Sequence, residues 1–447
     1  KMSRAVLYSC ALTGMSAPRV CVEVHLSAGL PAMTIVGLPD AGVRESRERV
    51  RSAIDSSGYE FSPGRFTVNL SPAALPKESG RFDLAIALGV LLATGQVRVN
   101  AKRLESLAQT YFIGELSLTG VLIPVQAPLV IGLSIFRENP QATLVMPYED
   151  AKIAANIEGL RVIGVRTLEE AVAFLRDPSQ AEHLLVKPEC QEDREEGDKY
   201  LDVGITVGNL PSSTPYSHTT GLCLSDIRGQ KEACYILEVV ASGGHGLLLK
   251  GSPGVGKSML AQRLPTLLPE LSTQQALEVT ALHSLSRQNL QAGPLSFSRD
   301  VPFRAPHHSA SMVSLVGGGA NASPGEISMA HHGVLFLDEL PEFDRRALEA
   351  LREPLEKGEI VVTRAKRTQV YPAKFQFIAA CNPCPCGYFG LQVQGGKSCK
   401  CKPDEISRYQ NKLSGPLLDR IDVHWYINPV DKDWMEQPQA ETSLNVR

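Results

Sequence analysis

The stretch Gly251-Ser-Pro-Gly-Val-Gly-Lys-Ser258 has the spacing of a phosphate-binding loop, with glycines ahead of a lysine and a hydroxyl. The apolar run 246–250 before it predicts a short buried strand, and 259–264 after it predicts a helix. In that context backbone N–H groups and the helix N-terminus can together bind a phosphate. A chance loop is the alternative, and the complete pattern between a strand and a helix makes it the weaker one.

The residues of this loop are predicted to bind the phosphates of a nucleotide. Gly254 and Gly256 can adopt positive φ and let the backbone approach a phosphate closely. Lys257 is predicted to reach the β- and γ-phosphates, and the Ser258 hydroxyl to ligate Mg²⁺. The predicted nucleotide-binding residues of the loop are Gly251, Ser252, Pro253, Gly254, Val255, Gly256, Lys257 and Ser258.

A second motif, Gly333-Val-Leu-Phe-Leu-Asp-Glu-Leu340, is an apolar strand that ends in two carboxylates. Asp338 is placed to hold Mg²⁺ through water and is counted with the nucleotide-binding residues. Glu339 is placed to orient or deprotonate the attacking water. The alternative is a buried strand that happens to end in acids. The spacing between the two motifs instead suits two strands of one nucleotide-binding sheet.

Length and composition limit the classes of protein. The 447 residues can form two or three domains, and 43% hydrophobic with 21% charged residues is ordinary for a globular protein. A net charge of −3 argues against a generally basic nucleic-acid binder, so such contacts would need a local basic patch. The sequence has no 18-residue apolar run and no signal-peptide pattern, which predicts a cytoplasmic protein with no membrane contact. The ten cysteines would there be thiols or metal ligands.

The first part of the chain, residues 1–183, is predicted to be a domain that mixes strands and helices. The alternating run 20–26 and the run 66–70 predict strands, 39–57 and 82–92 predict helices, and 111–120 predicts a hairpin with Gly120 near its turn. Residues 184–219 are predicted to be a linker because 188–198 is charged and poor in apolar residues. A solvated helix is the alternative for that segment.

The second part, residues 220–430, has the pattern of an α/β domain. Helices are predicted at 231–241, 267–285 and 345–358, a hairpin at 360–371 and a core strand at 375–380. The glycine- and proline-rich segments 302–309 and 316–321 predict an extended loop insertion. Residues 431–447 form a polar tail.

The motifs of the second part resemble those of AAA+ ATPases of the magnesium-chelatase-like group. From residue 3 to about 430 the chain resembles the ComM/YifB family as a whole. The segments that carry this resemblance are 226–230, 251–258, 303–311, 335–343, 382–387 and 414–422. The fold it implies is α/β: an AAA+ P-loop domain with a parallel sheet, preceded by a smaller Lon-protease-like (S5-like) α/β domain.

The resemblance also implies roles for residues outside the two nucleotide motifs. It implies a ring, a homo-hexamer, with ATP between subunits, and it places Ile227 and Gly229 at the nucleotide. Asn382 matches the sensor-1 position, where it would help to orient the lytic water. Arg420 matches the arginine finger that reaches the neighbouring subunit's nucleotide, where it would stabilise charge on the γ-phosphate. From the residues alone, an ion pair of Arg420 with Asp419 or Asp422 on a helix surface is the alternative.

The first domain resembles the N-terminal domain of the same family, which is similar in fold to the Lon protease domain and the C-terminal domain of RadA. Lon uses a Ser-Lys dyad, but here the nucleophile position falls at about Phe82 or Asp83, with Ser79 too early. The segment after 118–124 has no lysine until Lys152. Because such a mechanism needs a base beside the nucleophile, this domain is predicted to be a non-proteolytic scaffold or DNA-binding element.

The hairpin region 357–374 is a candidate DNA contact. It carries Lys357, Arg364, Lys366, Arg367 and Lys374 against the single acid Glu359. In the magnesium-chelatase-like group this hairpin projects into the pore of the ring, where Arg364, Lys366 and Arg367 could contact phosphates without reading sequence. A solvated hairpin is the alternative.

Four cysteines form a candidate zinc site. Cys384-Pro-Cys386 and Cys399-Lys-Cys401 are two short pairs, and four thiolates can make a tetrahedral site. The spacing differs from the usual C-x₂-C pairs, and four ordinary thiols are the alternative. The adjacent histidines 307–308 and 331–332 are not predicted to share a metal, because neighbours on a strand point to opposite faces. They are expected to form hydrogen bonds near the nucleotide or the pore.

The family type carries a helical lid after the arginine finger, and it is expected to be missing here. Residues 428–447 contain two prolines, Pro429 and Pro438, and no sustained apolar periodicity, which does not fit a packed helical bundle. Weaker nucleotide binding, slower hydrolysis and poorer ring formation are expected to follow.

The leading hypothesis is an ATP-hydrolysing ring motor that translocates on DNA. The resemblance implies a branch-migration helicase in homologous recombination during natural transformation, with ATP, Mg²⁺ and possible Zn²⁺ as cofactors and single-stranded or branched DNA as partner. A chelatase-type ATPase that remodels a protein partner is the rival. A Lon-like protease is a third class, which the missing dyad argues against. The response of ATP hydrolysis to single-stranded DNA would separate the first two.

Overall fold

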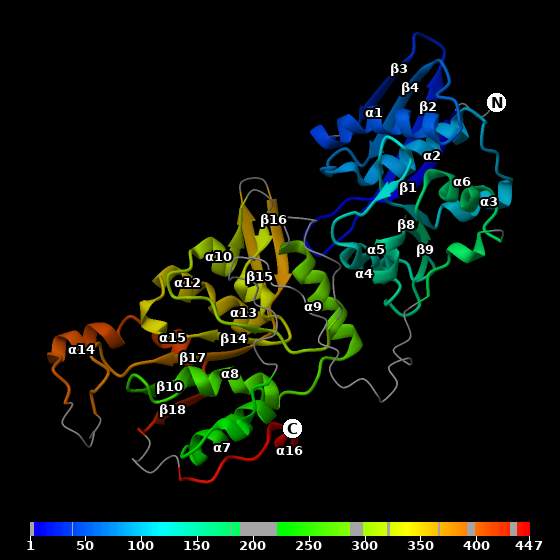
Figure 1. Cartoon of the computed structure of the whole chain (residues 1–447). Coiled ribbons are helices and arrows are strands. Elements are labelled where there is room, and N and C mark those ends of the chain that lie inside the picture. The colour runs from blue at the N-terminus through cyan, green and yellow to red at the C-terminus, as the bar shows by residue number, and fades with distance from the viewer. Residues whose placement is uncertain are drawn as a thin grey trace. The chain divides into compact units, whose positions relative to one another are not determined.

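The computed structural model of the chain describes residues 4–37, 39–179, 181–187, 221–286, 298–319, 322–364, 367–390, 398–429 and 436–447. These residues form two compact units, one made of the described residues up to 187 and the other of those from 221 on (Figure 1). Each unit has its own hydrophobic core.

The first unit is built on one mixed sheet. Its elements are β1 (Arg4–Cys10), β2 (Arg19–Ser27), β3 (Ala32–Val36), α1 (Ala41–Ser56), β4 (Arg65–Ser71), α2 (Asp83–Ala93), α3 (Ala101–Leu107), β5 (Thr110–Phe112), β6 (Glu115–Leu116), β7 (Leu122–Ile123), α4 (Pro128–Glu138), β8 (Thr143–Pro147), α5 (Tyr148–Ala154), β9 (Arg161–Val165) and α6 (Leu168–Arg176). The seven-stranded sheet has the order β3-β4-β2-β1-β5-β8-β9. β2 is antiparallel to both of its neighbours, and the remaining pairs are parallel.

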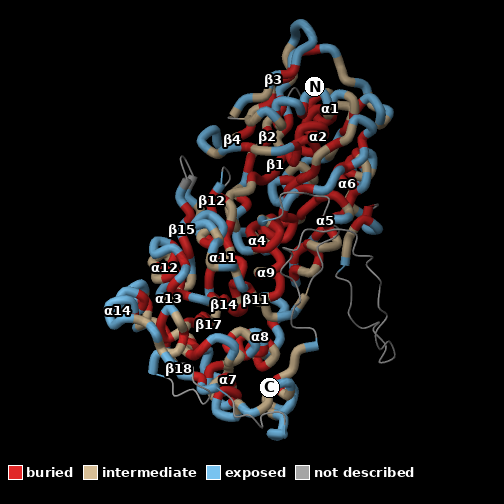
Figure 2. Tube along the Cα trace, turned by 60° about the vertical axis from the view of Figure 1, so that its left-hand side comes forward, coloured by how far each residue is buried: buried red, intermediate tan, exposed pale blue. Residues whose placement is uncertain are grey.

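Helix α2 is the centre of the first core, as the apolar run 82–92 predicted. All of its residues from Asp83 to Ala93 are buried, and Figure 2 shows it in red. It packs against β1 and β2, whose inward residues alternate with outward ones. Gly89 permits this close approach, because a Cβ there would lie 2.6 Å from Cγ2 of Val24.

The hairpin predicted over 111–120 is only partly present. Tyr111 and Phe112 belong to β5, which joins the main sheet in parallel with β1 and β8. The antiparallel pair is formed instead by β6 and β7, with Gly120 at φ 82° in the turn between them. Tyr111 and Phe112 are therefore core strand residues of the main sheet, a distinction that alternation alone does not make.

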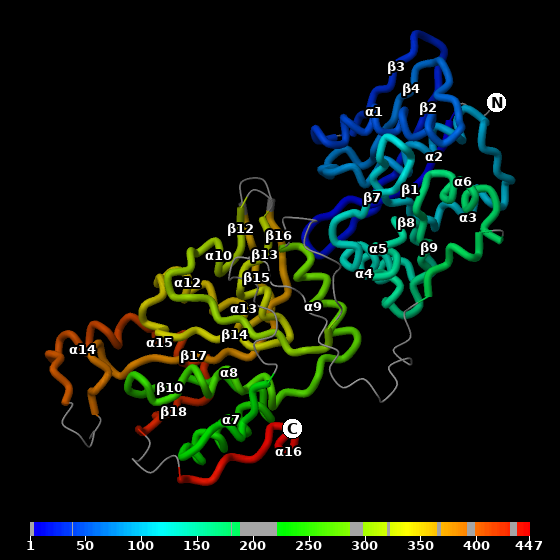
Figure 3. The backbone as a smooth tube through the Cα atoms, in the orientation of Figure 1, coloured from blue at the N-terminus to red at the C-terminus, as the bar shows by residue number. Residues whose placement is uncertain are grey.

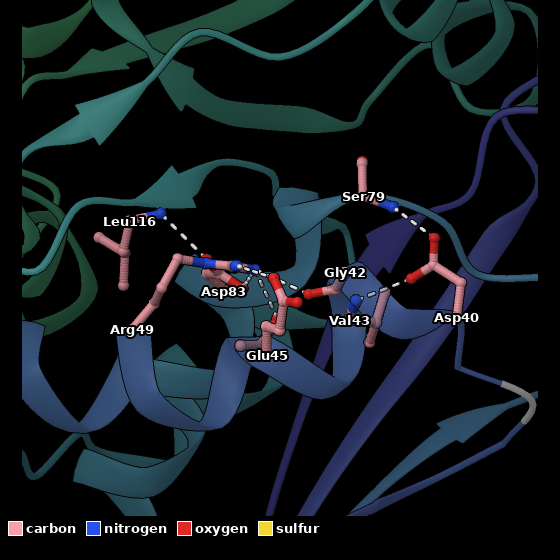
Figure 4. A network of polar contacts seen from close by, with 9 residues as sticks. Asp40, Gly42, Val43, Glu45, Arg49, Ser79, Asp83 and Leu116 are labelled. Atoms are coloured by element: carbon pink, nitrogen blue, oxygen red, sulfur yellow. Dashed lines mark hydrogen bonds and ion pairs between the residues drawn. The ribbon is translucent and has the colours of Figure 1, made fainter.

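A buried ion pair joins α1 to the start of α2 (Figure 4). Arg49 Nε donates to Asp83 Oδ2 at 2.6 Å, and the backbone N–H of Leu116 donates to the same oxygen at 3.2 Å. Asp40 caps α1 by accepting from the Val43 N–H and also accepts from the backbone N–H of Ser79. Asp83, which lies near the position of a Lon-type nucleophile, is thus fully buried and already paired.

The other residues weighed for a Ser-Lys dyad are engaged elsewhere. Phe82 is fully buried in the core. Ser79 Oγ accepts from Arg81 Nε at 3.1 Å. Lys152 pairs with Glu149 on α5 at 2.6 Å. Each of these side chains has a structural partner or place in the described unit.

Asp150 on α5 predicts a pH-dependent stability of the first unit. The carboxyl is buried, accepts from the Val125 N–H at 2.7 Å, and has its pKa raised to about 7 by burial. Because this pKa lies above the ordinary value near 3.9, the folded state holds a proton that the unfolded state releases. Stability should therefore fall as the pH rises from about 4 to about 7.

Asp150→Asn should remove that loss while keeping an acceptor for Val125. At pH 8 the variant should be more stable than the wild type by up to about 4 kcal/mol, and at pH 4 it should differ little. Chemical denaturation at both pH values measures the difference. Asp55→Asn, an exposed aspartate that also accepts from a backbone N–H, is the matched control. Equal pH profiles for the two variants would contradict the assignment.

The first unit continues past the predicted boundary at 183. Leu184 is buried, and the Val186 N–H donates to Val162 O at 3.0 Å. Residues 184–187 of the predicted linker therefore pack on this unit. The rest of that prediction, 188–219, lies outside the described residues.

The second unit contains a parallel sheet with helices around it. Its elements are α7 (Lys231–Gly243), β10 (Leu247–Gly251), α8 (Lys257–Leu267), α9 (Thr273–Ser286), β11 (Phe303–Arg304), α10 (Met312–Val316), β12 (Gly317–Gly318), β13 (Ser323–Pro324), α11 (Glu326–Met329), β14 (Val334–Leu337), α12 (Arg345–Ala350), α13 (Arg352–Lys357), β15 (Glu359–Arg364), β16 (Arg367–Pro372), β17 (Gln376–Cys381), α14 (Pro403–Gln410), α15 (Gly415–Leu418), β18 (Val423–Ile427) and α16 (Ser443–Val446). The five-stranded sheet has the order β11-β14-β17-β10-β18, and every pair in it is parallel.

The predicted loop insertion at 302–309 contains an edge strand. Phe303 and Arg304 form β11, which pairs with β14, and Arg304 makes a buried ion pair with Glu326 at 2.6 Å. This strand could not be predicted from the sequence pattern, because it has only two residues and prolines lie close to both of its ends. The predicted hairpin at 360–371 is confirmed by β15 and β16, which pair from Glu359↔Pro372 to Arg364↔Arg367.

The described residues from 436 on lie along the N-terminal part of the second unit. In Figure 3 this red segment runs beside α7. The Ala440 N–H donates to Ile227 O at 3.2 Å, and Ser443 Oγ accepts from the Leu224 N–H at 2.8 Å. No helix among the described residues is both long and apolar enough to cross a membrane.

Candidate nucleotide site

Three adjacent strands bring the predicted nucleotide residues to one edge of the sheet. β14, β17 and β10 are neighbours and run in parallel, so their carboxyl ends lie together. Asp338 follows β14, Asn382 follows β17, and the loop 251–258 follows β10. Ligands of open α/β sheets bind at this edge. The sequence motifs, which are far apart along the chain, thus meet at one place.

The loop has the backbone conformation that its glycines permit. Gly254 has φ 82° and Gly256 has φ 95°, both in the left-handed region that favours glycine. Gly256 is also the N-cap of α8, so the loop ends at a helix N-terminus. Exposed N–H groups at such a terminus attract a phosphate.

Lys257 connects the loop to the neighbouring strand. Its Nζ donates to Gly251 O at 2.9 Å, to Ser252 O at 3.0 Å and to Asn382 Oδ1 at 3.0 Å. The side chain is buried, and burial lowers the pKa of Lys257, an effect that the nearby carboxylates of Asp338 and Glu339 oppose. The predicted phosphate-binding lysine and sensor-1 asparagine are therefore in direct contact.

Ser258 and Asp338 form the part of the site that could hold Mg²⁺. Ser258 Oγ donates to Asp338 Oδ2 at 2.5 Å. A hydroxyl and a carboxylate oxygen are ligands that Mg²⁺ accepts, directly or through water, beside nucleotide phosphates. The two residues come from different motifs and lie together as the sequence predicted, so the donor set fits the ion.

Glu339 adopts an unusual backbone conformation and has a histidine partner. Its φ is 52°, in the left-handed region, which turns the chain sharply after the strand. His308 Nδ1 lies 3.1 Å from Glu339 Oε2. The segment after β11 thus supplies a side chain that holds the candidate catalytic carboxylate. From the sequence, His308 was expected to form hydrogen bonds near the nucleotide or the pore, and Glu339 was not identified as its partner.

Arg420 forms its ion pair with Glu356 and not with Asp419 or Asp422, the partners weighed from sequence. Its guanidinium pairs with Glu356 on α13, and Nη1 donates to Pro416 O. Asp422 instead accepts from the Gly246 N–H at 2.7 Å. Nothing in the sequence identified Glu356 as the partner of Arg420. It is one of several acidic residues on a helix surface, and the two residues are far apart in the chain.

Ile227 and Gly229 lie at the start of the second unit. Ile227 is buried in the core that also holds β10 and α8, and Gly229 has φ 70°. Gln230 Nε2 donates to Asn428 O at 3.1 Å, which ties this segment to the end of β18. The segment therefore flanks the strand that leads into the loop.

The four predicted zinc ligands form one cluster. The Sγ atoms of Cys384, Cys386, Cys399 and Cys401 all lie within 4.8 Å of one another. The two cysteine pairs come from opposite ends of a segment whose middle, 391–397, lies outside the described residues. Four thiolates at these separations are chemically suited to a tetrahedral metal ion.

The second histidine pair differs from the strand geometry assumed for it. His332 has φ 57°, and the rings of His331 and His332 lie side by side with centroids 3.8 Å apart and planes inclined by 40°. The reason given against a shared site, opposite faces of a strand, is therefore wrong. His332 Nε2 forms a hydrogen bond with Oε2 of Glu278 at 2.9 Å, and His331 Nε2 lies 3.6 Å from the same oxygen. The contacts with His331 and His332 hold the pKa of Glu278 far below its usual range.

Hydrogen bonding nevertheless accounts for this cluster. His331 Nδ1 accepts from the Lys374 N–H at 3.1 Å, so in the neutral ring Nε2 carries the proton and can donate to Glu278. The contacts join α9 to the base of the β15–β16 hairpin.

The hairpin itself has a packed face and an exposed face. Ile360, Val362 and Tyr371 are buried, whereas the cross-strand partners Val361 and Val370 are exposed. Lys366 lies outside the described residues, and the structure describes only the backbone of Arg364 and Arg367, which pair at the end of the strands.

Comparison with known proteins matches both units to one family. The family model described as "Magnesium chelatase, subunit ChlI" matches residues 223–435, and the model described as "Subunit ChlI of Mg-chelatase" matches residues 22–150.

Individual relatives match over nearly the whole chain. Escherichia coli YifB is 43% identical over 422 residues, which cover 94% of this chain and 75% of YifB. The competence protein ComM of Haemophilus influenzae is 41% identical over 448 residues, which cover 100% of this chain and 81% of ComM. The magnesium-chelatase 67 kDa subunit of Chlorobaculum tepidum is 28% identical over 167 residues, which cover 36% of this chain and 23% of that subunit.

Proposed function

This chain belongs to the ComM/YifB family of magnesium-chelatase-like AAA+ ATPases, and from that premise we propose that it is a ring motor that translocates on DNA. The proposal extends to branch migration in homologous recombination during natural transformation, in the cytoplasm. Residues 220–430 would be the motor domain of a homo-hexamer and 1–183 a non-proteolytic Lon-like domain. ATP and Mg²⁺ would be its cofactors, with Zn²⁺ as a further candidate on the four cysteines.

The single observation that supports ATP hydrolysis most strongly is the meeting of three motifs at one sheet edge. Lys257, Asp338 with Glu339, and Asn382 reach that edge from three adjacent strands. The DNA part of the proposal is supported by the basic sequence of the β15–β16 hairpin and by the relative named as a competence protein.

The residues divide the work of hydrolysis between phosphate binding and water activation. Lys257 would bind the β- and γ-phosphates, while Ser258 and Asp338 would hold Mg²⁺, which supplies charge neutralisation when bound. Glu339 would orient the water or take its proton, with Asn382 beside it. Arg420 would act on the neighbouring subunit's nucleotide, because an arginine in trans stabilises charge that develops on the γ-phosphate.

A chelatase-type ATPase that remodels a protein partner is the second candidate. The matches to the magnesium chelatase subunit models favour it. Single-stranded DNA separates the candidates, because it should raise the ATPase rate of a DNA motor and leave that of a protein remodeller unchanged.

Neutralising the hairpin tests the DNA contact. The triple variant Arg364→Ala, Lys366→Ala, Arg367→Ala should bind single-stranded DNA more weakly, and the slope of log K against log salt should flatten by about 2. Fluorescence anisotropy over a series of salt concentrations measures both quantities.

Three exposed arginines on α1 provide the matched control. Arg44→Ala, Arg47→Ala, Arg51→Ala removes the same charge from the first unit. An unchanged slope in the hairpin variant, together with a flattened slope in the α1 variant, would move the DNA contact to the first unit. No DNA binding by the wild type would favour the protein remodeller.

A further inference from the structure

We propose that Cys384, Cys386, Cys399 and Cys401 bind one zinc ion whose role is to support the phosphate-binding loop. Three of the Sγ–Sγ separations are 3.3, 3.7 and 3.6 Å, and all four atoms lie within 4.8 Å. Tetrahedral zinc with Zn–S bonds of about 2.3 Å requires sulfur atoms about 3.8 Å apart. The cluster is therefore close to the geometry that the ion needs.

The donor set selects the kind of metal. All four ligands are sulfur atoms, and the cluster contains no carboxylate or histidine. Soft thiolate ligands in a tetrahedral arrangement favour zinc or iron and disfavour magnesium and calcium, which prefer oxygen. Four thiolates close the coordination shell and leave no position for a substrate, which is the arrangement of a structural zinc site.

The cluster is continuous with the nucleotide site through the chain. Cys384 comes two residues after Asn382, which accepts from Lys257 Nζ. The turn 384–387 closes with the Gly387 N–H donating to Cys384 O at 2.9 Å. Gln410 on α14 donates to Pro383 O at 3.2 Å, so the helix after the second cysteine pair contacts the residue that precedes this turn.

The turn also lies directly against the phosphate-binding loop. Gly387 has φ 85°, and a Cβ at this position would lie 2.4 Å from Cδ of Pro253. A glycine is required both by the conformation and by the close approach. The backbone of the turn 384–387 thus packs directly against the Pro253 ring.

These contacts give the metal a role beyond joining two pairs of cysteines. Zinc would fix the turn 384–387, and the fixed turn would hold Pro253 on one side and Asn382 on the other. Loss of the ion should therefore loosen the loop and the Lys257–Asn382 contact together. This role rests on the proposed nucleotide site, whereas zinc binding itself does not.

Metal content is the first test. Elemental analysis of the full chain, purified without chelator, should find about one zinc per chain. The double variant Cys386→Ser, Cys399→Ser should lose the zinc, and Cys21→Ser, which removes a half-buried thiol from β2, should keep it. Wild-type protein with no metal, with iron in place of zinc, or with disulfides among these cysteines would overturn the site.

A glycine pair provides the second test, which leaves the ligands intact. Gly387→Ala should keep its zinc yet weaken binding of a fluorescent ATP analogue and lower turnover by about tenfold or more, because small displacements of a binding loop are costly. Gly390→Ala is the matched control, because Gly390 also has positive φ, at 76°, but a Cβ there meets nothing within 4 Å. A zinc-selective chelator, added to the wild-type chain while Mg²⁺ is kept in excess, should reproduce the Gly387→Ala effect.

The outcomes separate the inference from the proposed function. If zinc is bound but Gly387→Ala and Gly390→Ala bind nucleotide equally well, the supporting role is wrong. If both tests succeed while DNA fails to stimulate ATP hydrolysis, the DNA motor is wrong and the zinc site stands. If the wild-type chain binds no nucleotide at all, the proposed ATPase fails and so does the supporting role, while the metal content still decides the site.

Discussion

The Lys257→Ala variant should bind ATP about 10- to 100-fold more weakly than the wild-type chain, because a charge-assisted contact to phosphate is worth about 1.5–3 kcal/mol. Lys257 Nζ sits over the loop, within 3.0 Å of two loop carbonyls and of Asn382 Oδ1. Its loss would remove the cation that the phosphates meet in the ground state. Titration with a fluorescent ATP analogue measures the effect.

Lys250→Ala is the control for this prediction. Lys250 lies just before the loop, and its Nζ is 5.4 Å from the centre of the Tyr426 ring rather than in the loop. The control removes the same charge at nearly the same place, so it should bind the analogue about as well as the wild type. An equal loss of affinity in both variants would show that the effect comes from the change in net positive charge near the site and not from a contact of Lys257. Wild-type affinity in Lys257→Ala would show that Lys257 does not bind the phosphates.

The nucleotide motifs could be predicted from sequence because their information is local. The loop 251–258 requires glycines, a lysine and a hydroxyl at fixed spacing, and Asp338 follows an uninterrupted apolar strand. Their meeting in space followed from one rule, that the carboxyl ends of parallel strands share an edge. In the structure Lys257 donates to Asn382, and Ser258 donates to Asp338, so residues from the ends of neighbouring strands are in contact.

Contacts between distant segments could not be predicted in this way. The partner of Arg420 is Glu356, and that of Glu339 is His308, and neither pair has a fixed spacing. The strand β11 has only two residues, which is too short to show a period. The left-handed conformation of His332 overturns the argument that the side chains of His331 and His332 point to opposite faces of a strand. Sequence periodicity carries no information about such single backbone angles.

The cysteine cluster lies between these cases. Two C-x-C pairs suggested a common site, but only the structure shows that their sulfur atoms converge and that the turn 384–387 lies against Pro253. The glycine at 387 had no meaning in the sequence beyond a turn. Its importance comes from the close approach of two segments more than a hundred residues apart.

Glu339→Gln should separate binding of ATP from its hydrolysis. Glutamine has nearly the same size, so the variant should bind the ATP analogue as tightly as the wild type. It cannot take a proton from water, and turnover should fall by about 10²- to 10⁴-fold, the usual contribution of a positioned general base. Such a fall in turnover without a change in ground-state affinity identifies a group that acts only in the transition state.

Glu342→Gln provides the comparison on the same segment. Glu342 is exposed and pairs with Lys412 at 3.1 Å, so its carboxylate points to a surface partner. Its replacement should leave turnover near the wild-type rate. Because His308 holds the Glu339 carboxylate at 3.1 Å, His308→Ala should lower turnover less than Glu339→Gln and should not affect Glu339→Gln further. Wild-type turnover in Glu339→Gln would transfer the role of base to another residue, whatever the position of Glu339 at the sheet edge.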